Sequence, residues 1–394
     1  MQIVGMNFQI RSKNYRKDFL SHMQEFKDIL PLTDKQQTDI QQLSPYFMKH
    51  DITLENALFF DIETTGLAAD YCSVYIIGCI HIGEHDCHRT IYFADTPDDE
   101  QQLLVMFFEQ TKKFKHLIHF NGEGFDIPFL TKRSTGYDID CPLTNMDSFD
   151  IFKKIRPFKA ILQLENAKQK SLELFLGIER EDIYTGGELI QVYKDYVKQP
   201  TDDARKLLLQ HNLDDLEGMV LLLPILLYPY LFEQIPDIIN IHTNKYPSLS
   251  GEIQTELLIE AAIPLDIPKP FSYQKNGFYL NVNKDILTIR CHVFEGELKH
   301  FYDNYQDYYY LPMEDTAIHK SVAEFVDKSY RKKATKSSCY TRHSGSFIHQ
   351  PAEICQPVYK SDVKTKQFYF PLEKIQEDDT QVAFAKSVLE YLKP

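Results

Sequence analysis

The feature that most constrains the fold is a short apolar run that ends in two acids and a tight turn. It reads Ala-Leu-Phe-Phe-Asp-Ile-Glu-Thr-Thr-Gly-Leu over residues 57–67. A run of this kind is typical of a strand buried on both faces of a sheet. Because side chains alternate along a strand, Asp61 and Glu63 point to the same side if the strand continues through Glu63.

Two carboxylates side by side at the end of a buried strand repel each other and are costly to remove from water. A bound divalent cation offsets both costs, and the hard cations Mg²⁺ and Mn²⁺ prefer carboxylate oxygens. The sequence therefore predicts that Asp61 and Glu63 bind metal. The alternative is a strand that ends in a solvated acidic turn.

The composition indicates a globular protein of two or three domains. The chain has 394 residues, 43% of them hydrophobic and 25% charged, which argues against wholesale disorder. Basic residues interrupt residues 1–20, and the longest apolar run, residues 219–231, is too short for a membrane span. Seven cysteines without a CxxC pair fit free thiols. We therefore expect a cytoplasmic protein with no signal peptide and no membrane partner.

Residues 55–235 alternate between strand and helix patterns, after a lead-in over residues 1–54 that is predicted to be helical. The lead-in helices are expected at 18–30 and 33–50. In the domain itself, predicted strands span 58–63, 73–82, 90–94, 116–120 and 143–149, and predicted helices span 100–112, 127–133, 171–176, 187–198 and 201–223. Three closely spaced strands followed by alternating elements predict an α/β domain with a mixed five-stranded sheet flanked by helices.

Residues 245–394 are predicted to form a separate C-terminal α+β domain of unknown function. Predicted strands span 277–282, 285–293 and 308–311, and predicted helices span 250–262, 315–331 and 382–392.

Two further motifs add candidate metal ligands. Residues 121–126, Asn-Gly-Glu-Gly-Phe-Asp, lie at a strand-to-helix junction, where sheets of this kind bind ligands. His211 and Asp215 lie four residues apart, so they share one face of a helix. A histidine one turn from a carboxylate can serve in metal binding and proton transfer. The alternatives are that Asp126 caps the following helix and that His211 is an ordinary surface histidine.

Together the three motifs resemble those of the DEDD superfamily of 3′–5′ exonucleases, which have an RNase H-like fold, and within it the YprB-like family. The resemblance covers about residues 55–230. The matching segments are Asp-Ile-Glu-Thr-Thr-Gly-Leu at 61–67, residues 121–130 around Asp126, and His211-x-x-x-Asp215.

The last motif departs from the usual pattern at His211, where family members have tyrosine at the same spacing. A sister subgroup has histidine there, but its acid lies one residue further on, a position that is Leu216 in this chain. Asp215 is therefore the better candidate for the fourth acid. The departure affects the assignment of the general base and leaves the four acids in place.

The resemblance implies phosphodiester hydrolysis with two divalent cations, Mg²⁺ or Mn²⁺, held roughly 4 Å apart. Asp61 and Asp215 would bind the first with Glu63 beside it, and Asp61 with Asp126 would help to place the second. His211 would orient or deprotonate the attacking water.

Another acid, Asp147, lies near the end of the predicted fifth strand. This residue could approach the metals, or it could simply end the strand in a turn.

The formal net charge of −14 means that nucleic-acid binding depends on where basic residues gather. Residues 153–170 contain six Lys or Arg and one acid, and residues 328–350 contain six Lys or Arg and no acid, with aromatic residues between them. Both stretches could instead be solvated faces. The predicted nucleic-acid contacts are Thr64, Asn121, Lys153, Lys154, Lys170, Arg331, Lys332 and Lys333.

These inferences favour a hydrolase, a metal-dependent 3′–5′ exonuclease that acts on an end of single-stranded DNA or RNA. The alternatives are a structure-selective endonuclease on the same fold and a non-catalytic nucleic-acid-binding or scaffold protein. Four acids together argue against a non-catalytic protein, and the lack of a GxxxxGK[ST] loop argues against a P-loop kinase or ATPase. The C-terminal domain could bind substrate or a protein partner.

Overall fold

A computed structural model describes residues 23–28, 32–83, 86–179, 184, 186–248 and 250–394. The chain divides into two compact units. The first comprises the described residues of Met1–Arg156 with Asn166–Leu226, and the second comprises those of Pro157–Glu165 with Leu227–Pro394. Within the described residues, no helix is both long and apolar enough to span a membrane.

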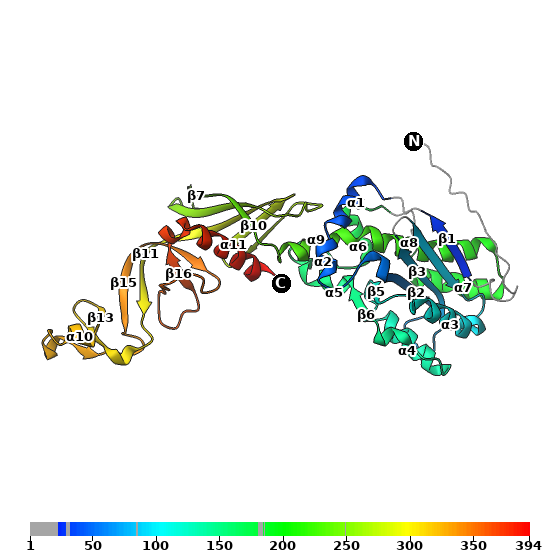
Figure 1. Ribbon diagram of the computed structural model, residues 1–394, viewed down its shortest axis with the longest axis horizontal. Helices are drawn as coiled ribbons and strands as arrows, with labels where there is room; N and C mark the ends of the chain where they lie inside the picture. The colour runs from blue at the N-terminus through cyan, green and yellow to red at the C-terminus, as the bar shows by residue number, and fades with distance from the viewer. Residues whose placement is uncertain (1–22, 29–31, 84–85, 180–183, 185, 249) are drawn as a thin grey trace. The chain divides into compact units, whose positions relative to one another are not determined.

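The first unit is built on a mixed sheet with helices packed on it (Figure 1). Within the described residues, the strand order is β1-β4-β3-β2-β5-β6. Neighbours from β1 to β2 are antiparallel, whereas β5 and β6 run parallel to β2. The strands are β1 (Met23–Asp28), β2 (Ala57–Thr64), β3 (Val74–Ile82), β4 (Cys87–Phe93), β5 (His116–His119) and β6 (Asp147–Asp150). The predicted mixed α/β sheet and its antiparallel meander are confirmed.

The helices of this unit follow the predicted order. They are α1 (Asp34–Gln41), α2 (Ser44–Met48), α3 (Glu100–Thr111), α4 (Asp126–Gly136), α5 (Ile151–Ile155), α6 (Gln169–Leu176), α7 (Gly186–Lys198) and α8 (Asp202–Leu221). Helix α3 covers one face of the sheet, where the Phe107 ring lies 5.7 Å from that of Phe60. Helix α8 packs on β2 and β3, on the side to which Asp61 points, because adjacent residues of a strand face opposite ways.

The helix predicted over residues 18–30 is wrong in its described part. Met23–Asp28 is a strand that pairs antiparallel with β4, so the sheet has one strand more than predicted. A free sheet edge offers a row of unpaired N–H and C=O groups, and pairing with it can override a weak local preference. The rest of that predicted helix lies outside the described residues.

A fully buried acid links the elements around the turn that follows β2. Glu100, at the start of α3, accepts hydrogen bonds from the Val74 N–H at 2.8 Å, from Arg133 Nε at 2.8 Å and from the Tyr137 hydroxyl at 2.8 Å. Arg133 also donates to the Ala69 carbonyl oxygen at 3.0 Å. The turn between β2 and β3 is therefore attached to α3 and α4 by charge-assisted bonds.

The second unit is rich in strands. Its larger sheet contains β16-β15-β11-β10-β9 in that order, with β8 also paired to β11 and β7 paired to β8, and a smaller sheet has the order β13-β12-β14. The larger sheet contains β7 (Asp237–Pro247), β8 (Ile253–Ala262), β9 (Phe271–Lys275), β10 (Phe278–Asn283), β11 (Ile286–Phe301), β15 (Tyr340–Gln350) and β16 (Phe368–Pro371). The smaller sheet contains β12 (Tyr308–Leu311), β13 (Thr316–His319) and β14 (Lys332–Lys333), and the unit's helices are α9 (Leu227–Leu231), α10 (Lys320–Ala323) and α11 (Asp378–Leu392).

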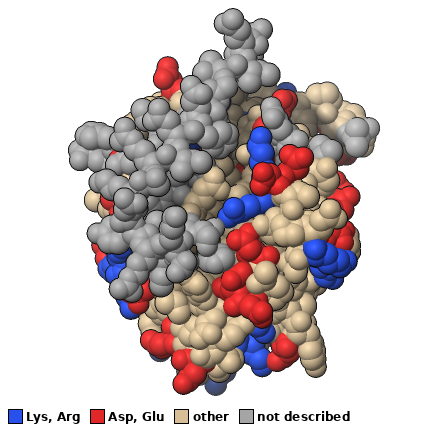
Figure 2. Space-filling model, turned by 90° about the vertical axis from the view of Figure 1, so that its right-hand side faces the viewer, with Lys and Arg blue, Asp and Glu red and all other residues tan. Residues whose placement is uncertain are grey.

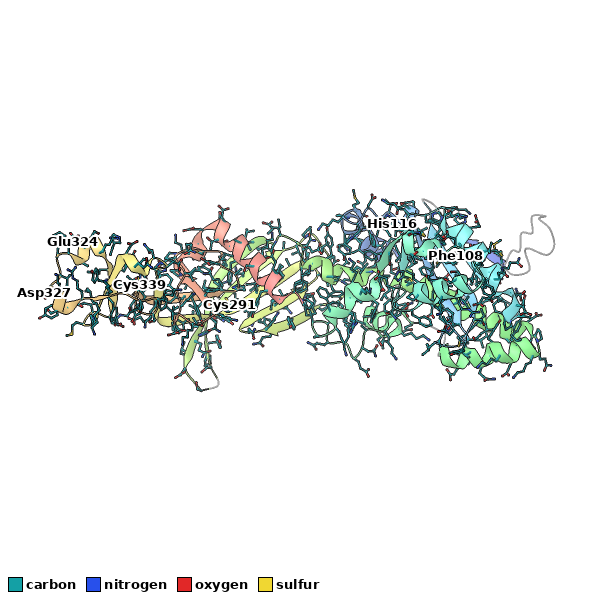
Figure 3. All side chains as sticks on the ribbon, turned by 90° about the horizontal axis from the view of Figure 1, so that it is seen from below. Phe108, His116, Cys291, Glu324, Asp327 and Cys339 are labelled. Atoms are coloured by element: carbon teal, nitrogen blue, oxygen red, sulfur yellow. The ribbon has the colours of Figure 1, made fainter. Side chains whose placement is uncertain are left out.

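Two helices predicted in this unit are wrong. The predicted helix over residues 250–262 is mostly strand β8, whose alternate residues Leu257, Ile259 and Ala261 are buried. Residues 315–331 contain β13 and only the short helix α10, because β13 forms a hairpin with β12. In Figure 3, Glu324 and Asp327 of this segment lie beyond Cys339 at the end of the unit away from Cys291.

Gly78 of β3 allows α8 to approach the sheet, and we predict that Gly78→Ala destabilises the protein. A Cβ at Gly78 would lie 1.9 Å from Asn212 Oδ1 and 2.5 Å from Leu216 Cδ1, both on α8. We expect the free energy of unfolding, measured by chemical denaturation, to fall by about 1–3 kcal/mol, as overpacking does in well-packed cores.

Gly136→Ala is the matched control. No atom lies within 4 Å of a Cβ at Gly136, so we expect little change or a gain of about 0.4–1 kcal/mol. Equal stability of the two variants would contradict the close packing of α8.

Candidate metal centre

Two of the candidate ligands lie near the carboxyl end of strand β2. Glu63 is the second-to-last residue of β2 and its side chain is 12% exposed, and Asp61 lies two residues earlier on the same side. A register shift between Glu63 and Thr64 interrupts the pairing with β3. Such a bulge at the end of a strand can redirect the side chains next to it.

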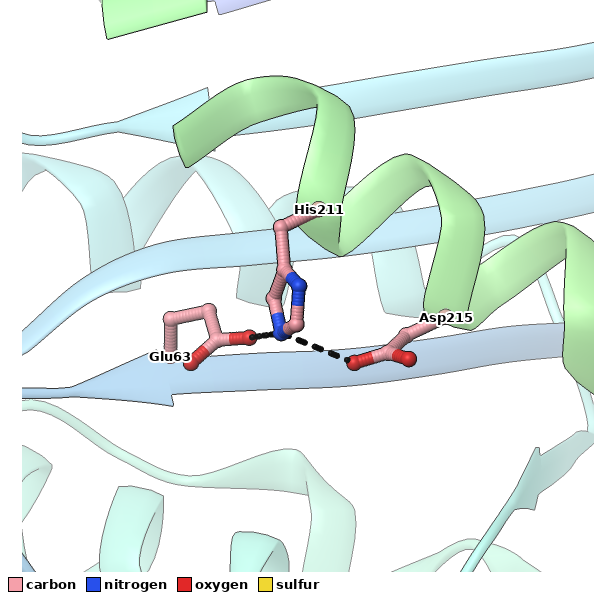
Figure 4. Close-up of side chains that lie close together, drawn as sticks. All are labelled: Glu63, His211 and Asp215. Carbon is pink, nitrogen blue, oxygen red and sulfur yellow. Dashed lines mark ion pairs between the residues drawn. The ribbon is translucent and has the colours of Figure 1, made fainter. Parts of the chain in front are cut away.

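Glu63, His211 and Asp215 form a group whose potential ligand atoms all lie within 4.8 Å of one another (Figure 4). His211 Nε2 is 3.4 Å from Glu63 Oε1 and 3.4 Å from Asp215 Oδ2. The imidazole is 4% exposed, so His211 is not the surface histidine considered as its alternative. The predicted pair on α8 therefore meets the predicted acid on β2.

Asp61 is held by a residue that sequence reasoning did not select. Asn212 of α8 donates from Nδ2 to Asp61 Oδ2 at 2.9 Å, and Asn212 is fully buried. A signal was present, because Asn212 lies midway between Leu208 and Leu216 on the buried stripe of α8. An amide on an apolar stripe has to find a polar partner in the sheet that the stripe covers.

Asp126 is the first residue of α4 and is 6% exposed. Its carboxyl is hydrogen-bonded by the backbone N–H of Ile62, which lies between Asp61 and Glu63 on β2. Burial, together with a smaller effect of the Asp150 charge, raises the pKa of Asp126 to about 7. Phe125 occupies the N-cap position, so Asp126 is not the cap considered as its alternative.

Asp61 and Glu63 also affect the ionisation of the Tyr75 phenol on β3. Burial, followed by the charges of Glu63 and Asp61, raises the pKa of the Tyr75 phenol, so this group stays neutral. Its ring stacks on that of Tyr193 of α7, with 4.0 Å between centroids. The wall of the site on this side is therefore aromatic and uncharged.

Asp147 does not belong to the site. It begins β6, opposite His116 at the start of β5, so it lies at the other end of these parallel strands. Its side chain is 67% exposed and lies 3.8 Å from His116 Nδ1.

Most of the predicted nucleic-acid contacts in the first unit have partners within the protein. Thr64 is buried and donates to the Gly66 carbonyl oxygen at 2.8 Å, and Lys170 donates to that of Tyr184 at 2.8 Å. Lys153 forms an ion pair with Glu123.

The other two predicted nucleic-acid contacts of this unit are Lys154 and Asn121. The Lys154 ammonium lies 5.3 Å from the centre of the Phe149 ring, and Asn121 has a left-handed backbone with φ of 64°. Figure 2 shows acidic and basic side chains interspersed on one face, with no continuous basic patch among the residues drawn in colour.

The basic stretch of the second unit is divided between structural and exposed positions. The Arg331 guanidinium lies 4.9 Å from the centre of the Tyr309 ring and donates to the Ala323 carbonyl oxygen. Lys332 and Lys333 form β14, and both are exposed. The lysine side chains are therefore better placed than Arg331 to meet a polyanion.

A second group of potential ligands was not predicted. His119, Glu123 and Asp150 also have ligand atoms within 4.8 Å of one another, at the carboxyl ends of β5 and β6. Their sequence signal was weak, because His119 ends a strand and Glu123 lies in the loop after it, so their four-residue spacing does not place them on one helix face.

Replacing Asn212 with aspartate is expected to destabilise the metal-free protein in a pH-dependent way. The new carboxylate would lie against Asp61, so one folded-state pKa of the pair rises above its unfolded value. Stability is then lost as pH rises through that raised pKa. In EDTA, the Asn212→Asp loss should be about 3 kcal/mol or more at about pH 8 and smaller at about pH 5, by thermal unfolding.

Asn212→Ser is the control, because it removes the amide without adding charge. Its loss of stability should be similar at the two pH values. A loss in Asn212→Asp that is equally independent of pH would show that the side chain of residue 212 does not face Asp61.

Part of the first unit matches a known protein-family model. Residues 58–226 match the family model described as RNase_H superfamily. No curated protein matches the chain.

Solved structures match it at low identity. The family B DNA polymerase of Pyrobaculum calidifontis is 14% identical (TM-score 0.36), and the match covers 64% of this chain and 35% of the polymerase. A structure of exonuclease I is 13% identical (TM-score 0.28), covering 52% of this chain and 55% of exonuclease I. The zinc-bound complex of E. coli exonuclease I with single-stranded DNA is 11% identical (TM-score 0.26), covering 85% and 69%. The family match and the sheet order together show that residues 58–226 have an RNase H-like fold.

Proposed function

We propose that this protein is a divalent-metal-dependent nuclease that hydrolyses phosphodiester bonds of DNA or RNA, and that it acts as a 3′–5′ exonuclease of the DEDD type. The observation that carries the proposal is the meeting of Glu63 with His211 and Asp215 at the end of β2. These residues come from segments far apart in the sequence. The RNase H-like fold around them supports a nuclease, and the order of the motifs supports the exonuclease.

The side chains present fit hard cations. Carboxylate oxygens outnumber nitrogen donors, as suits Mg²⁺ or Mn²⁺. Asp61, Glu63, Asp126 and Asp215 would hold two such ions, which lower the pKa of bound water and neutralise charge on the leaving oxygen. Asp61 and Asp126 lie outside the 4.8 Å group, but Asp61 is on the same strand as Glu63, and Asp126 of α4 accepts a hydrogen bond from the backbone of Ile62 between them.

His211 would orient the attacking water or take up its proton. Its Nε2 atom faces both Glu63 and Asp215, so the imidazole is placed between the two acids rather than toward bulk solvent. An imidazole can both accept and donate a proton. This side chain replaces the tyrosine of related motifs and would perform the same positioning with a different acid–base group.

Basic side chains would contact the phosphate backbone of the substrate. We propose Lys154 in the first unit and Lys332 and Lys333 in the second as phosphate contacts, because the Lys154 ammonium contacts a ring and the Lys332 and Lys333 side chains are exposed. Lys153 and Lys170 would first have to leave Glu123 and Tyr184, respectively. Thr64 and Asn121 would contribute through the backbone conformation of the turns in which they lie.

The first test of this function is the double variant Asp61→Ala with Glu63→Ala. We expect it to lose cleavage by at least about a hundredfold, because several kcal/mol of metal-dependent stabilisation disappears. The assay uses single- and double-stranded DNA and RNA labelled at either end, with Mg²⁺, Mn²⁺ or EDTA. A ladder of products that starts at the 3′ end supports the exonuclease, whereas discrete internal cuts favour a structure-selective endonuclease.

Glu109→Ala with Asp140→Ala is the charge-matched control, because both acids are exposed and lie away from the site. Its cleavage rate should equal that of the wild type. Wild-type cleavage by the Asp61–Glu63 variant would refute the site, and no cleavage by the wild-type protein would favour a nucleic-acid-binding protein.

The second test uses the raised pKa of Asp126, which is about 7. A metal ion has to displace the proton of this carboxyl, so Mn²⁺ affinity should rise about tenfold per pH unit below pH 7 and level off above it. Calorimetric titration of Mn²⁺ between about pH 5.5 and about pH 8.5 measures this slope.

The variant Asp126→Asn should flatten the slope, and Asp140→Asn, which changes an exposed acid, should keep it. An affinity with the same pH slope in wild type and Asp126→Asn would exclude Asp126 as a ligand.

A further inference from the structure

The loop between β5 and α4 is held by two buried side chains that the proposed chemistry does not use. Three consecutive backbone N–H groups of this loop have side-chain acceptors. Asn121 N–H donates to Asp150 Oδ1 at 2.9 Å, and Glu123 N–H donates to Asp150 Oδ2 at 3.4 Å. Between them, Gly122 N–H donates to His119 Nδ1 at 3.0 Å.

The two acceptors are fixed in place. The side chains of His119 and Asp150 are each 1% exposed. Asp150 also caps α5 by accepting from the Lys153 N–H at 3.3 Å. A buried carboxylate with three backbone donors has little freedom to move, because any displacement leaves a polar group without its partner.

The hydrogen bonds of His119 define its tautomer. Nδ1 accepts from Gly122, so the neutral ring carries its proton on Nε2, which lies 2.8 Å from Ser148 Oγ. Ser148 in turn donates to Glu123 Oε1 at 2.8 Å. Burial lowers the pKa of His119 to about 4, so the ring stays neutral at physiological pH.

Close packing restricts the loop further. A Cβ at Gly122 would lie 2.6 Å from His119 Cγ, so only glycine lets the backbone contact the ring this closely. The carbonyl oxygen of Gly122 accepts from the Ile127 N–H at 2.9 Å, which joins the loop to the first turn of α4. Asp126 lies in that turn.

The alternative interpretation is that this cluster binds a cation, since His119, Glu123 and Asp150 offer ligand atoms close together. Their atoms already have partners, however. Nδ1 and both Asp150 oxygens accept backbone N–H groups, and Glu123 accepts from Ser148 and from Lys153. The atoms of this cluster are therefore already engaged in holding the loop.

We propose that His119 and Asp150 are positioning residues that anchor the loop 121–125 and thereby place the Asp126 carboxylate for metal binding. This inference rests on the proposed function, because it concerns the same metal centre. Anchoring residues of this kind commonly change metal affinity by about 10–100-fold without touching the ion.

The experiment combines hydrogen exchange with Mn²⁺ titration of the full-length protein. In Asp150→Asn and His119→Leu, exchange of a peptide covering residues 120–127 should speed up at least about tenfold, and the Mn²⁺ dissociation constant should rise at least about tenfold. His119→Asn keeps an acceptor where Nδ1 lies, so it should retain most of the protection and affinity that His119→Leu loses.

Ser148→Ala provides a variant that is expected to fold, because Ser148 is exposed. It removes only the link between His119 and Glu123, and its exchange and affinity should lie between those of the wild type and His119→Leu. Thr144→Val removes another exposed hydroxyl away from the loop and should match the wild type.

The outcomes separate the two proposals. Faster exchange with wild-type Mn²⁺ affinity, or unchanged exchange in Asp150→Asn, His119→Leu and Ser148→Ala, would overturn the positioning role while leaving the nuclease proposal intact. If the wild-type protein itself binds no Mn²⁺ and cleaves no substrate, the proposed function fails together with the role of the loop in it.

Discussion

The contact between α8 and the β2–β3 pair is the constraint on which the rest of the site depends. At Gly78, opposite Asp61 in the register of the strands, the sheet has no side chain, and α8 occupies that space with Asn212 and Leu216. The same helix then delivers His211 and Asp215 to Glu63. A shift of α8 away from the sheet would separate these three side chains and remove the donor from Asp61.

Around this contact, two networks of buried polar side chains hold the turns of the sheet. Glu100 attaches the turn after β2 to α3 and α4, and Asp150 with His119 attaches the turn after β5. Both turns flank the candidate metal centre. Since a buried polar group without a partner costs about 1–3 kcal/mol, each network resists the local rearrangements that would displace a ligand.

The second unit is organised around one long strand, β11. Its long strand β11 pairs with β8 and β10 in its first half and with β15 in its second half, so one strand joins two parts of the sheet. Exposed Lys332 and Lys333 lie on the edge strand of the smaller sheet, where lysines also discourage pairing with other chains. The two roles of these lysines are compatible, because either requires only that their ammonium groups reach solvent.

The sequence by itself was sufficient for the features that local pattern encodes. The period of apolar residues located β2 to β5 and the main helices, and the acids at strand and helix ends identified Asp61, Glu63, Asp126, His211 and Asp215 as candidates. Tertiary structure decided what depends on partners distant in the chain. Strand β1 exists because β4 offers a free edge, and β8 is a strand because β7 and β11 flank it, although its residues favour a helix. Asn212, His119 and Asp150 acquire their roles in the same way, because a hydrogen-bond partner is set by packing and not by spacing along the sequence.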